Sequence, residues 1–445
     1  METTDLADLS AAQLARLIDD GVTTATEVVE ASLARIEARD GQVQAWTFLD
    51  PDHARAQAQR LDALRAAGGP VGPLHGVPVG VKDIFDTADM PTENGTVLDA
   101  GRQPRTDSAA VALLRAAGAV IMGKTVTTEM AVYAPGKTRN PHDPSRTPGG
   151  SSSGSAAAVA AGMVPVAVGT QTNGSVIRPA SFCGIVGYKP THGRISRAGI
   201  LPLSRGLDQV GVFARSVEDA ALIAECLMAH DPADPDTRPR AAPRLAEIAA
   251  QEPPAPPRLA FFRTPVWDRA EAATREAFEE LRDFLGDACH EIDLPPAFDR
   301  VVDDLKAIMF TDLARNLAGY VARGEDRISD ILRGMMDEGR TVTALDYTTA
   351  VERMAPLNAW LADLGTDFDA FLTPATPGEA PVGDATGDPV FCTIWSYLGV
   401  PAVSLPLMQG EAGMPLGVQL VAPRGDDGRL LRNGRWLAQR VAEDA

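Results

Sequence analysis

The sequence is poor in cysteine and has no long uninterrupted apolar run. Its four cysteines show no Cys-x-x-Cys spacing, which fits a reducing compartment and a protein without metal. No run is long enough to span a bilayer, so no membrane partner is expected. The first five residues are acidic rather than basic and predict no signal peptide. Because the six histidines lack metal-ligand spacing as well, we expect a cytoplasmic protein with no metal and no cofactor.

Basic residues are also scarce relative to acidic ones. The chain has 41 Lys and Arg against 60 Asp and Glu, a net charge of −19. Phosphate binding requires a basic surface, so nucleic acid is not expected as a main partner. We attribute the acidity to solubility. An apolar content of 45% is ample for a large core.

Predicted strands and helices alternate along almost the whole chain. This alternation is typical of an α/β protein, here with a large mixed sheet between helical layers. Capping boxes at Ser10–Gln13 and Thr24–Glu27 predict the first two helices. Further predicted helices are 52–67, 107–117, 156–162, 216–229, 274–285, much of 303–361, and 430–442. Predicted strands are 46–49, 77–82, 119–123, 164–168, 207–213, 259–262, 290–294, 371–374, 403–406 and 418–421.

We expect one domain spanning residues 1–445, because strands of the same sheet are predicted on both sides of a proline- and charge-rich segment, 230–257. Within it we distinguish N-terminal helices (1–70), a core (71–229), a variable and mostly helical excursion (230–380), and a C-terminal return to the sheet (381–445).

The most informative stretch is Thr147–Thr191, which contains two clusters of glycine and serine around a small-residue apolar segment. Ala156–Gly162 predicts a buried helix, and Val164–Val168 a buried strand that leads into a turn at 170–175. Glycine beside serine at a strand end permits sharp bends and free N–H groups. Such a turn suits an exposed nucleophile with an oxyanion hole.

Four sequence motifs together resemble the amidase signature family of serine hydrolases. They are Gly-Val-Pro-Val-Gly-Val-Lys-Asp at 76–83, Gly-Gly-Ser-Ser at 149–152, Gly-Thr-Gln-Thr-Asn-Gly-Ser at 169–175, and the segment from Cys183-Gly184 to Lys189-Pro190-Thr191. The resemblance covers most of the chain and is weakest over 232–369. The combination is specific, although no single motif would be.

The resemblance implies a Ser–Ser–Lys triad with Ser175 as nucleophile, Ser151 as bridging serine and Lys82 as base. It also implies a cis peptide bond at Gly150–Ser151 and backbone oxyanion donors. The implied reaction is hydrolysis of a carboxamide through an acyl-enzyme, with anilides, carbamates and esters as further substrates of the same chemistry. The expected partner is a small amide, and a homodimer is left open. The oxyanion donors would be the N–H groups of Thr172, Asn173, Gly174 and Ser175.

Two positions depart from the family pattern. Asn173 stands where glycine is usual, and asparagine is the residue that best tolerates a left-handed backbone after glycine, so we expect the turn to survive. Its side chain should add volume or a hydrogen bond at the cleft floor. Gln171 replaces a common acidic residue and removes a charge near the site.

Three residues are candidates for binding substrate. Met130 and Tyr133 lie in an irregular segment that we expect to form one wall of the cleft, although packing alone would explain them equally well. Arg178 occupies the position at which a relative acting on a small carboxylated amide binds the substrate carboxylate. A structural arginine that braces the loop is the interpretation we favour.

Other interpretations use the same residues. Gly150–Gly154 matches the Gly-x-Ser-x-Gly nucleophile elbow, but that motif must follow a strand, and a turn region precedes it here. The glycine-rich segment is not interpreted as a phosphate-binding loop, because no Gly-Lys-Ser/Thr follows it. A non-catalytic binding subunit is not favoured, because all three residues of the triad are present. The main alternative is the amidase (A) subunit of a tRNA-dependent amidotransferase, which releases ammonia from glutamine.

Overall fold

The structure, a computed structural model that describes residues 5–443, is built around one mixed sheet of eleven strands. The strand order is β1-β3-β2-β4-β6-β5-β10-β11-β9-β7-β8. The predicted α/β class with a large mixed sheet is therefore confirmed. The strands are β1 (Trp46–Leu49), β2 (Pro78–Lys82), β3 (Val120–Thr125), β4 (Val166–Gln171), β5 (Val186–Lys189), β6 (Gln209–Ala214), β7 (Leu259–Phe262), β8 (Cys289–Ile292), β9 (Ala370–Pro374), β10 (Ala402–Gln409) and β11 (Pro415–Val421).

Helices cover both faces of this sheet. On β10, Val403 and Leu405 face α15, whereas Ser404 points to the opposite face, near Ser181 of α6. The described helices are α1 (Ala11–Asp19), α2 (Ala25–Val43), α3 (Pro51–Ala66), α4 (Ala109–Ala116), α5 (Ser153–Ala160), α6 (Ile177–Cys183), α7 (Val217–Leu227), α8 (Leu245–Ala250), α9 (Ala272–Leu285), α10 (Val301–Asn316), α11 (Ala318–Gly324), α12 (Asp330–Thr341), α13 (Ala344–Leu364), α14 (Val390–Leu398) and α15 (Asp427–Ala442).

Most predicted elements occur within a few residues of their predicted bounds. Both predicted capping boxes, which begin at Ser10 and Thr24, are present and satisfy N–H groups at the starts of α1 and α2. The sequence prediction missed α6, β5, α8 and α14. The first two lie inside the glycine- and serine-rich motifs, where the apolar periodicity that identifies an element is missing.

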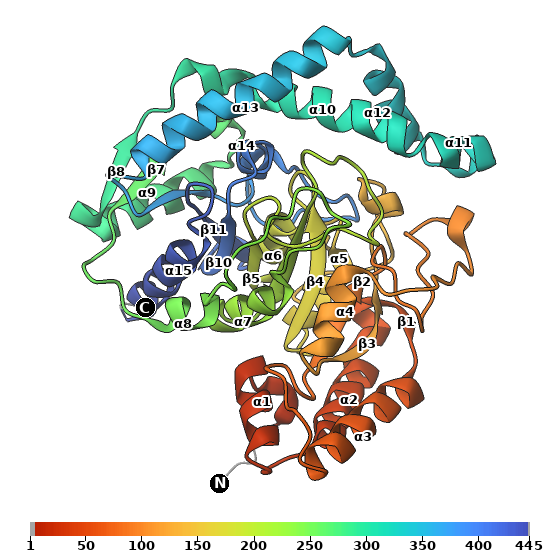
Figure 1. Ribbon diagram of the computed structural model, residues 1–445. Coiled ribbons are helices and arrows are strands. Elements are labelled where there is room, and N and C mark those ends of the chain that lie inside the picture. The colour runs from red at the N-terminus through yellow and green to blue at the C-terminus, as the bar shows by residue number, and fades with distance from the viewer. Residues whose placement is uncertain (1–4, 444–445) are drawn as a thin grey trace.

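Residues 230–380 contribute more than helices to the molecule. Their strands β7, β8 and β9 form one end of the sheet, next to β11. Their helices α10, α12 and α13 form a layer along the top of Figure 1, above α14, while α1–α3 lie at the opposite end of the molecule. Helix α10 packs on α14, so this layer covers one side of the region where the polar motifs gather.

The sheet places the two main motifs side by side. Strand β2 is hydrogen-bonded in parallel to β4, with Val79 opposite Val166 and Val81 opposite Val168. The carboxyl ends of both strands therefore meet at one edge, which is where sites form in parallel sheets. Lys82 ends β2 there, and the 172–175 turn leaves β4 at the same edge.

None of the described helices combines the length and the apolar character that a membrane span requires. Residues 1–4, on which most of the signal-peptide prediction depends, lie outside the described part of the chain.

Candidate active site

Lys82 lies at the centre of the site, fully buried at the end of β2. Its Nζ donates to Ser151 Oγ at 2.7 Å and to Thr170 Oγ1 at 3.0 Å. Burial lowers the pKa of Lys82 well below its ordinary value, and the charge of Asp208 acts in the opposite direction. Desolvation thus favours the neutral amine, the form that can accept a proton.

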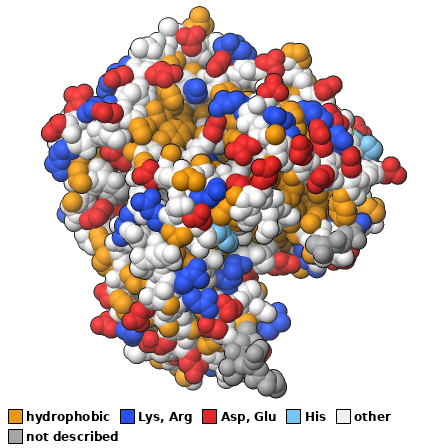
Figure 2. All heavy atoms as spheres, turned by 180° about the vertical axis from the view of Figure 1, so that it is seen from behind, with side chains coloured by type: hydrophobic (Ala, Val, Ile, Leu, Met, Phe, Trp, Pro, Cys, Tyr) orange, Lys and Arg blue, Asp and Glu red, His pale blue; other side chains and the backbone are white. Residues whose placement is uncertain are grey.

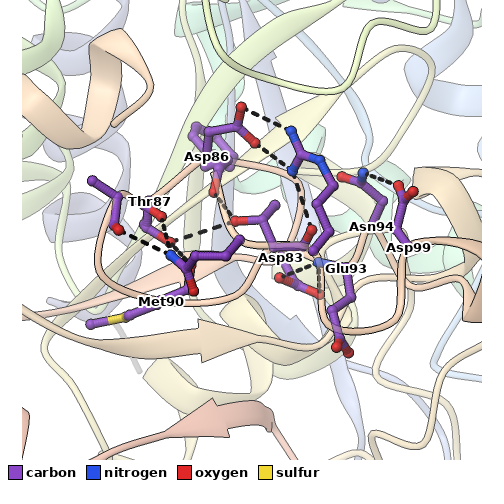
Figure 3. A network of polar contacts seen from close by, with 12 residues as sticks. Asp83, Asp86, Thr87, Met90, Glu93, Asn94 and Asp99 are labelled. Carbon is purple, nitrogen blue, oxygen red and sulfur yellow. Dashed lines mark hydrogen bonds and ion pairs between the residues drawn. The ribbon is translucent and has the colours of Figure 1, made fainter. Parts of the chain in front are cut away.

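The neighbouring Asp83 does not neutralise Lys82, in agreement with its expected opposite orientation on the strand. Its carboxylate lies 3.4 Å from Nζ of a second buried lysine, Lys124, and accepts the N–H of Glu93. Figure 3 shows the loop that carries Asp83, Asp86, Thr87 and Glu93 folded into one polar network. Burial raises the pKa of Asp83 to about 6 and lowers that of Lys124 to about 8, so near neutral pH both are ionised.

Ser151 follows a cis peptide bond, Gly150–Ser151, as the family resemblance implies. The two preceding glycines leave no room for side chains: a Cβ on Gly149 would meet Pro179, and one on Gly150 would meet Thr386 and Thr128. Nη2 of Arg178 donates to the Gly150 carbonyl at 2.7 Å. The backbone around Ser151 is therefore fixed from both sides while its Oγ faces Lys82.

Ser175 lies in the turn between β4 and α6 and is 8% exposed. Across the described residues, its Oγ makes no hydrogen bond, and neither do the backbone N–H groups of residues 172–175. Gln171 satisfies the two N–H groups that follow the turn: its Oε1 accepts that of Val176 at 2.8 Å and that of Ile177 at 2.9 Å. Four free N–H groups beside a hydroxyl form a cradle for an oxyanion.

The side chain of Asn173 is held between two elements. Its Nδ2 donates to Tyr133 OH at 3.2 Å, and its Oδ1 accepts from Thr393 Oγ1 of α14 at 2.9 Å. Ser396 of α14 donates to its carbonyl. The side chain therefore adds hydrogen bonds, as expected, and φ of Asn173 is not positive, so the tolerance of asparagine for a left-handed backbone is not used here. The turn needs no left-handed residue there, since the Gln171 side chain rather than a tight backbone turn satisfies the start of α6.

A pocket of about 180 Å³ opens beside Asn173. One side is polar and includes Tyr133, Asn173 and Thr393. The opposite side is one face of α10, whose pocket residues recur at helical spacing. Asp388 and Arg269, which form an ion pair, also line it. The α10 residues are Val302, Leu305, Lys306, Met309 and Phe310.

The three predicted substrate-binding residues have different positions. Tyr133 lines the pocket. Met130 is fully buried within the hydrophobic core and does not line it. Arg178 is fully buried behind Tyr133, with its guanidinium 5.9 Å from the ring centroid. Its Nε and Nη1 have no hydrogen-bond partner within residues 5–443, and burial lowers its pKa.

Ser152 would be the nucleophile in the nucleophile-elbow interpretation of Gly150–Gly154. It is fully buried, its Oγ donates to the Thr170 carbonyl at 3.2 Å, and no described strand leads directly into it. A nucleophile elbow requires a serine exposed after a strand.

Several residues near the site were not identified from the sequence. They include Thr170, which contacts Lys82, and Asp208, which accepts a hydrogen bond from Oγ1 of the predicted site residue Thr172 at 2.6 Å. Thr170 belongs to a motif quoted above, which was a usable signal. Asp208, Thr393 and the α10 residues come from distant segments and carry no local signal.

Comparison with known proteins gives consistent results. The family model described as Amidase matches residues 27–431. The chain is 37% identical to the (A) subunit of the glutamyl-tRNA(Gln) amidotransferase of Salinispora arenicola, over 98% of each chain. Among solved structures, it is similar to 6-aminohexanoate cyclic dimer hydrolase in complex with substrate, with a TM-score of 0.87, 27% identity and 98% of each chain covered. It also resembles the peptide amidase of Stenotrophomonas maltophilia, with a TM-score of 0.84, 29% identity, and 98% and 97% covered.

Proposed function

Because this chain belongs to the Amidase family of amide-cleaving enzymes, we propose that it hydrolyses a carboxamide C–N bond through an acyl-enzyme on Ser175. One arrangement carries the proposal: Nζ of the fully buried Lys82, whose pKa is lowered by burial, lies 2.7 Å from Ser151 Oγ, and the four N–H groups of residues 172–175 are free. A nucleophile, a base and oxyanion donors are the groups that acyl transfer requires.

The proton path follows from this arrangement. Neutral Lys82 takes the proton of Ser151, which takes that of Ser175 as Ser175 Oγ attacks the carbonyl carbon. The oxyanion is stabilised by the N–H groups of the 172–175 turn. The relay then returns the proton to the leaving nitrogen, the C–N bond breaks, and an ester on Ser175 remains. Water attacks the ester by the same path, which releases the carboxylate and restores the enzyme. Catalytic hydrogen bonds often close only with substrate, which accounts for the unpartnered Ser175 Oγ.

Arg178 supports this path without binding substrate. Its Nη2 holds the Gly150 carbonyl, the bond that leads into Ser151. It is fully buried behind Tyr133 and does not line the pocket. We therefore assign it to bracing the loop, with its charge adding to the positive potential around the oxyanion.

The experiment is a fluorophosphonate label combined with hydrolysis of 4-nitroacetanilide. Wild type should hydrolyse the anilide and be labelled on Ser175, as located by peptide mass spectrometry. Ser175→Ala should remain folded by circular dichroism, lose turnover and lose the label. The matched variant Ser152→Ala should keep the label, because its serine is closed. Label on Ser152 would support the nucleophile elbow and overturn the proposal.

The second candidate is the glutamine-hydrolysing subunit of a tRNA amidotransferase, which the 37% identity to such a subunit favours. Two observations favour an independent amidase. Glutamine brings an ammonium and a carboxylate, yet in the pocket Asp388 and Arg269 neutralise each other and the α10 side is apolar apart from Lys306. The net charge is −19, and on the face drawn in Figure 2 acidic side chains are intermingled with basic ones.

These two functions separate in one assay of the purified chain. An independent amidase should release ammonia from propionamide without any partner and hydrolyse glutamine poorly. Glutamine hydrolysis that appears only after a partner protein is added would reverse the assignment.

A further inference from the structure

The pocket beside Asn173 can be assigned to one half of the substrate. In the proposed reaction Lys82 and Ser151 return a proton to the leaving nitrogen, so the leaving group must lie on their side of the scissile bond. Neither residue lines the pocket, and Thr170, which contacts Lys82, lines a different cavity of about 250 Å³. The pocket therefore lies on the acyl side of the carbonyl carbon.

Asn173 forms part of the polar wall of this acyl pocket. It precedes Ser175 by two residues, and its side chain bonds to Tyr133 at one end and Thr393 at the other. The turn itself is packed against α14, because a Cβ on Gly174 would lie 2.7 Å from Pro389. Held by two elements, the amide cannot swing aside to admit a longer chain without breaking these two hydrogen bonds.

The remaining walls define what fits. Val302, Leu305 and Met309 present an apolar face to the acyl chain. Opposite them, after its bond to Tyr133, Asn173 keeps one N–H of Nδ2 without a partner among the described residues. A long alkyl chain would press on that amide and strip water from it without offering a hydrogen bond. A short acyl group stops before it.

We propose that Asn173 is a specificity-determining residue that restricts this enzyme to amides of short acyl groups. The inference rests on the proposed function, because it places the acyl group of an amide substrate in this pocket. The oxyanion donor at this position is the backbone N–H, so the side chain is free to set chain length.

The test measures kcat/KM for the 4-nitroanilides of acetate, butyrate, hexanoate and octanoate. In wild type the values should fall with chain length. In Asn173→Ala the ratio of octanoyl to acetyl activity should rise by roughly tenfold or more, since one methylene in a pocket already changes selectivity by about 10-fold. The change should appear mainly as a lower KM for the long anilides.

Two further sets of variants guard the result. Asn173→Gly is measured as well, so that the result does not depend on how alanine affects the turn. The φ at this position is not positive, which suits either residue. Tyr133→Phe and Thr393→Val each remove one anchor but keep the asparagine, so their ratios should lie between those of wild type and Asn173→Ala.

The outcomes are distinct. An unchanged chain-length profile in both Asn173→Ala and Asn173→Gly would overturn the inference while leaving the amidase function intact. So would a profile that responds to the size of the amine but not to that of the acyl chain. Failure of wild type to cleave any of the anilides, or the corresponding primary amides, would instead contradict the proposed function itself.

Discussion

Lys82 Nζ lies 2.7 Å from Ser151 Oγ in a fully buried position. Within residues 5–443, no carboxylate is within ion-pair distance of this amine, whereas the second buried lysine, Lys124, has Asp83 at 3.4 Å. Two lysines on neighbouring strands thus have opposite environments. Burial without a carboxylate partner lowers the pKa of Lys82, which suits the proton exchange proposed for it, whereas the Asp83 carboxylate opposes the effect of burial on Lys124.

The first prediction concerns the identity of the base. Lys82→Ala should lower kcat/KM for 4-nitroacetanilide by at least the roughly 10²–10⁴-fold that a general base contributes. Lys82→Arg should be no better, because a guanidinium cannot give up its proton. Both are measured at several pH values, with folding checked by circular dichroism. Near-wild-type activity of Lys82→Arg would indicate that the lysine acts only through its charge, which would contradict the proton relay.

The second prediction concerns pH. A lowered pKa means that Lys82 becomes neutral at a lower pH than an ordinary lysine, whose pKa is about 10.4. The rate should therefore rise with pH as Lys82 loses its proton, with an apparent pKa below that value. Asp208 stabilises the ammonium form of Lys82, so in Asp208→Asn the rise of the rate with pH should occur at lower pH.

The control for this shift is Asp337→Asn, an exposed carboxylate on α12 that does not act on Lys82. Its profile of kcat/KM against pH should match that of wild type. If kcat/KM of Asp208→Asn rose over the same pH range as that of wild type, a group other than Lys82 would govern the rise.

The third prediction concerns Gln171, which holds the oxyanion turn open. Gln171→Leu leaves the N–H groups of Val176 and Ile177 unpaired and buried, at a cost of about 1–3 kcal/mol each. It should also lower kcat by roughly 10²–10³-fold, the effect of losing an oxyanion donor. Gln171→Glu keeps an oxygen that accepts both N–H groups, loses only the Nε2 bond to Ser396, and should retain most of the activity. Equal losses in the two variants, by urea unfolding and by kcat, would contradict this role.

The sequence was more informative about the motifs that carry the candidate catalytic residues than about the walls of the pocket. Lys82, Ser151 and Ser175 stand in contiguous motifs, and the strand that ends at Lys82 and the strand that leads into the Ser175 turn are short apolar runs with clear ends. The structure brings Lys82 and Ser151 together. The pocket could not be predicted, because α10 reaches Asn173 across more than 120 residues of intervening chain. The partners of the Asn173 side chain, Tyr133 and Thr393, could not be predicted either, because they come from segments far away in the sequence.

The last prediction concerns Lys124 and Asp83, the pair that fixes the loop after β2. Lys124 Nζ also donates to the Phe85 carbonyl and to Thr92 Oγ1, both at 2.6 Å, so a single side chain ties the loop to β3. Lys124→Met leaves the Asp83 carboxylate buried without its cation, and breaking a buried pair in this way costs about 3–5 kcal/mol. The loop begins directly after Lys82, so kcat should fall with stability.

The double variant separates the ion pair from the other contacts of Lys124. Lys124→Met combined with Asp83→Asn removes both charges and should be less destabilised than the sum of the single variants, by about 0.5–3 kcal/mol. Lys137→Met, at an exposed lysine, should stay within about 0.5 kcal/mol of wild type. Urea unfolding of the four variants measures this coupling. Strictly additive losses would mean that Lys124 acts through Phe85 and Thr92 alone, and that the charge of Asp83 contributes nothing to holding Lys82 in place.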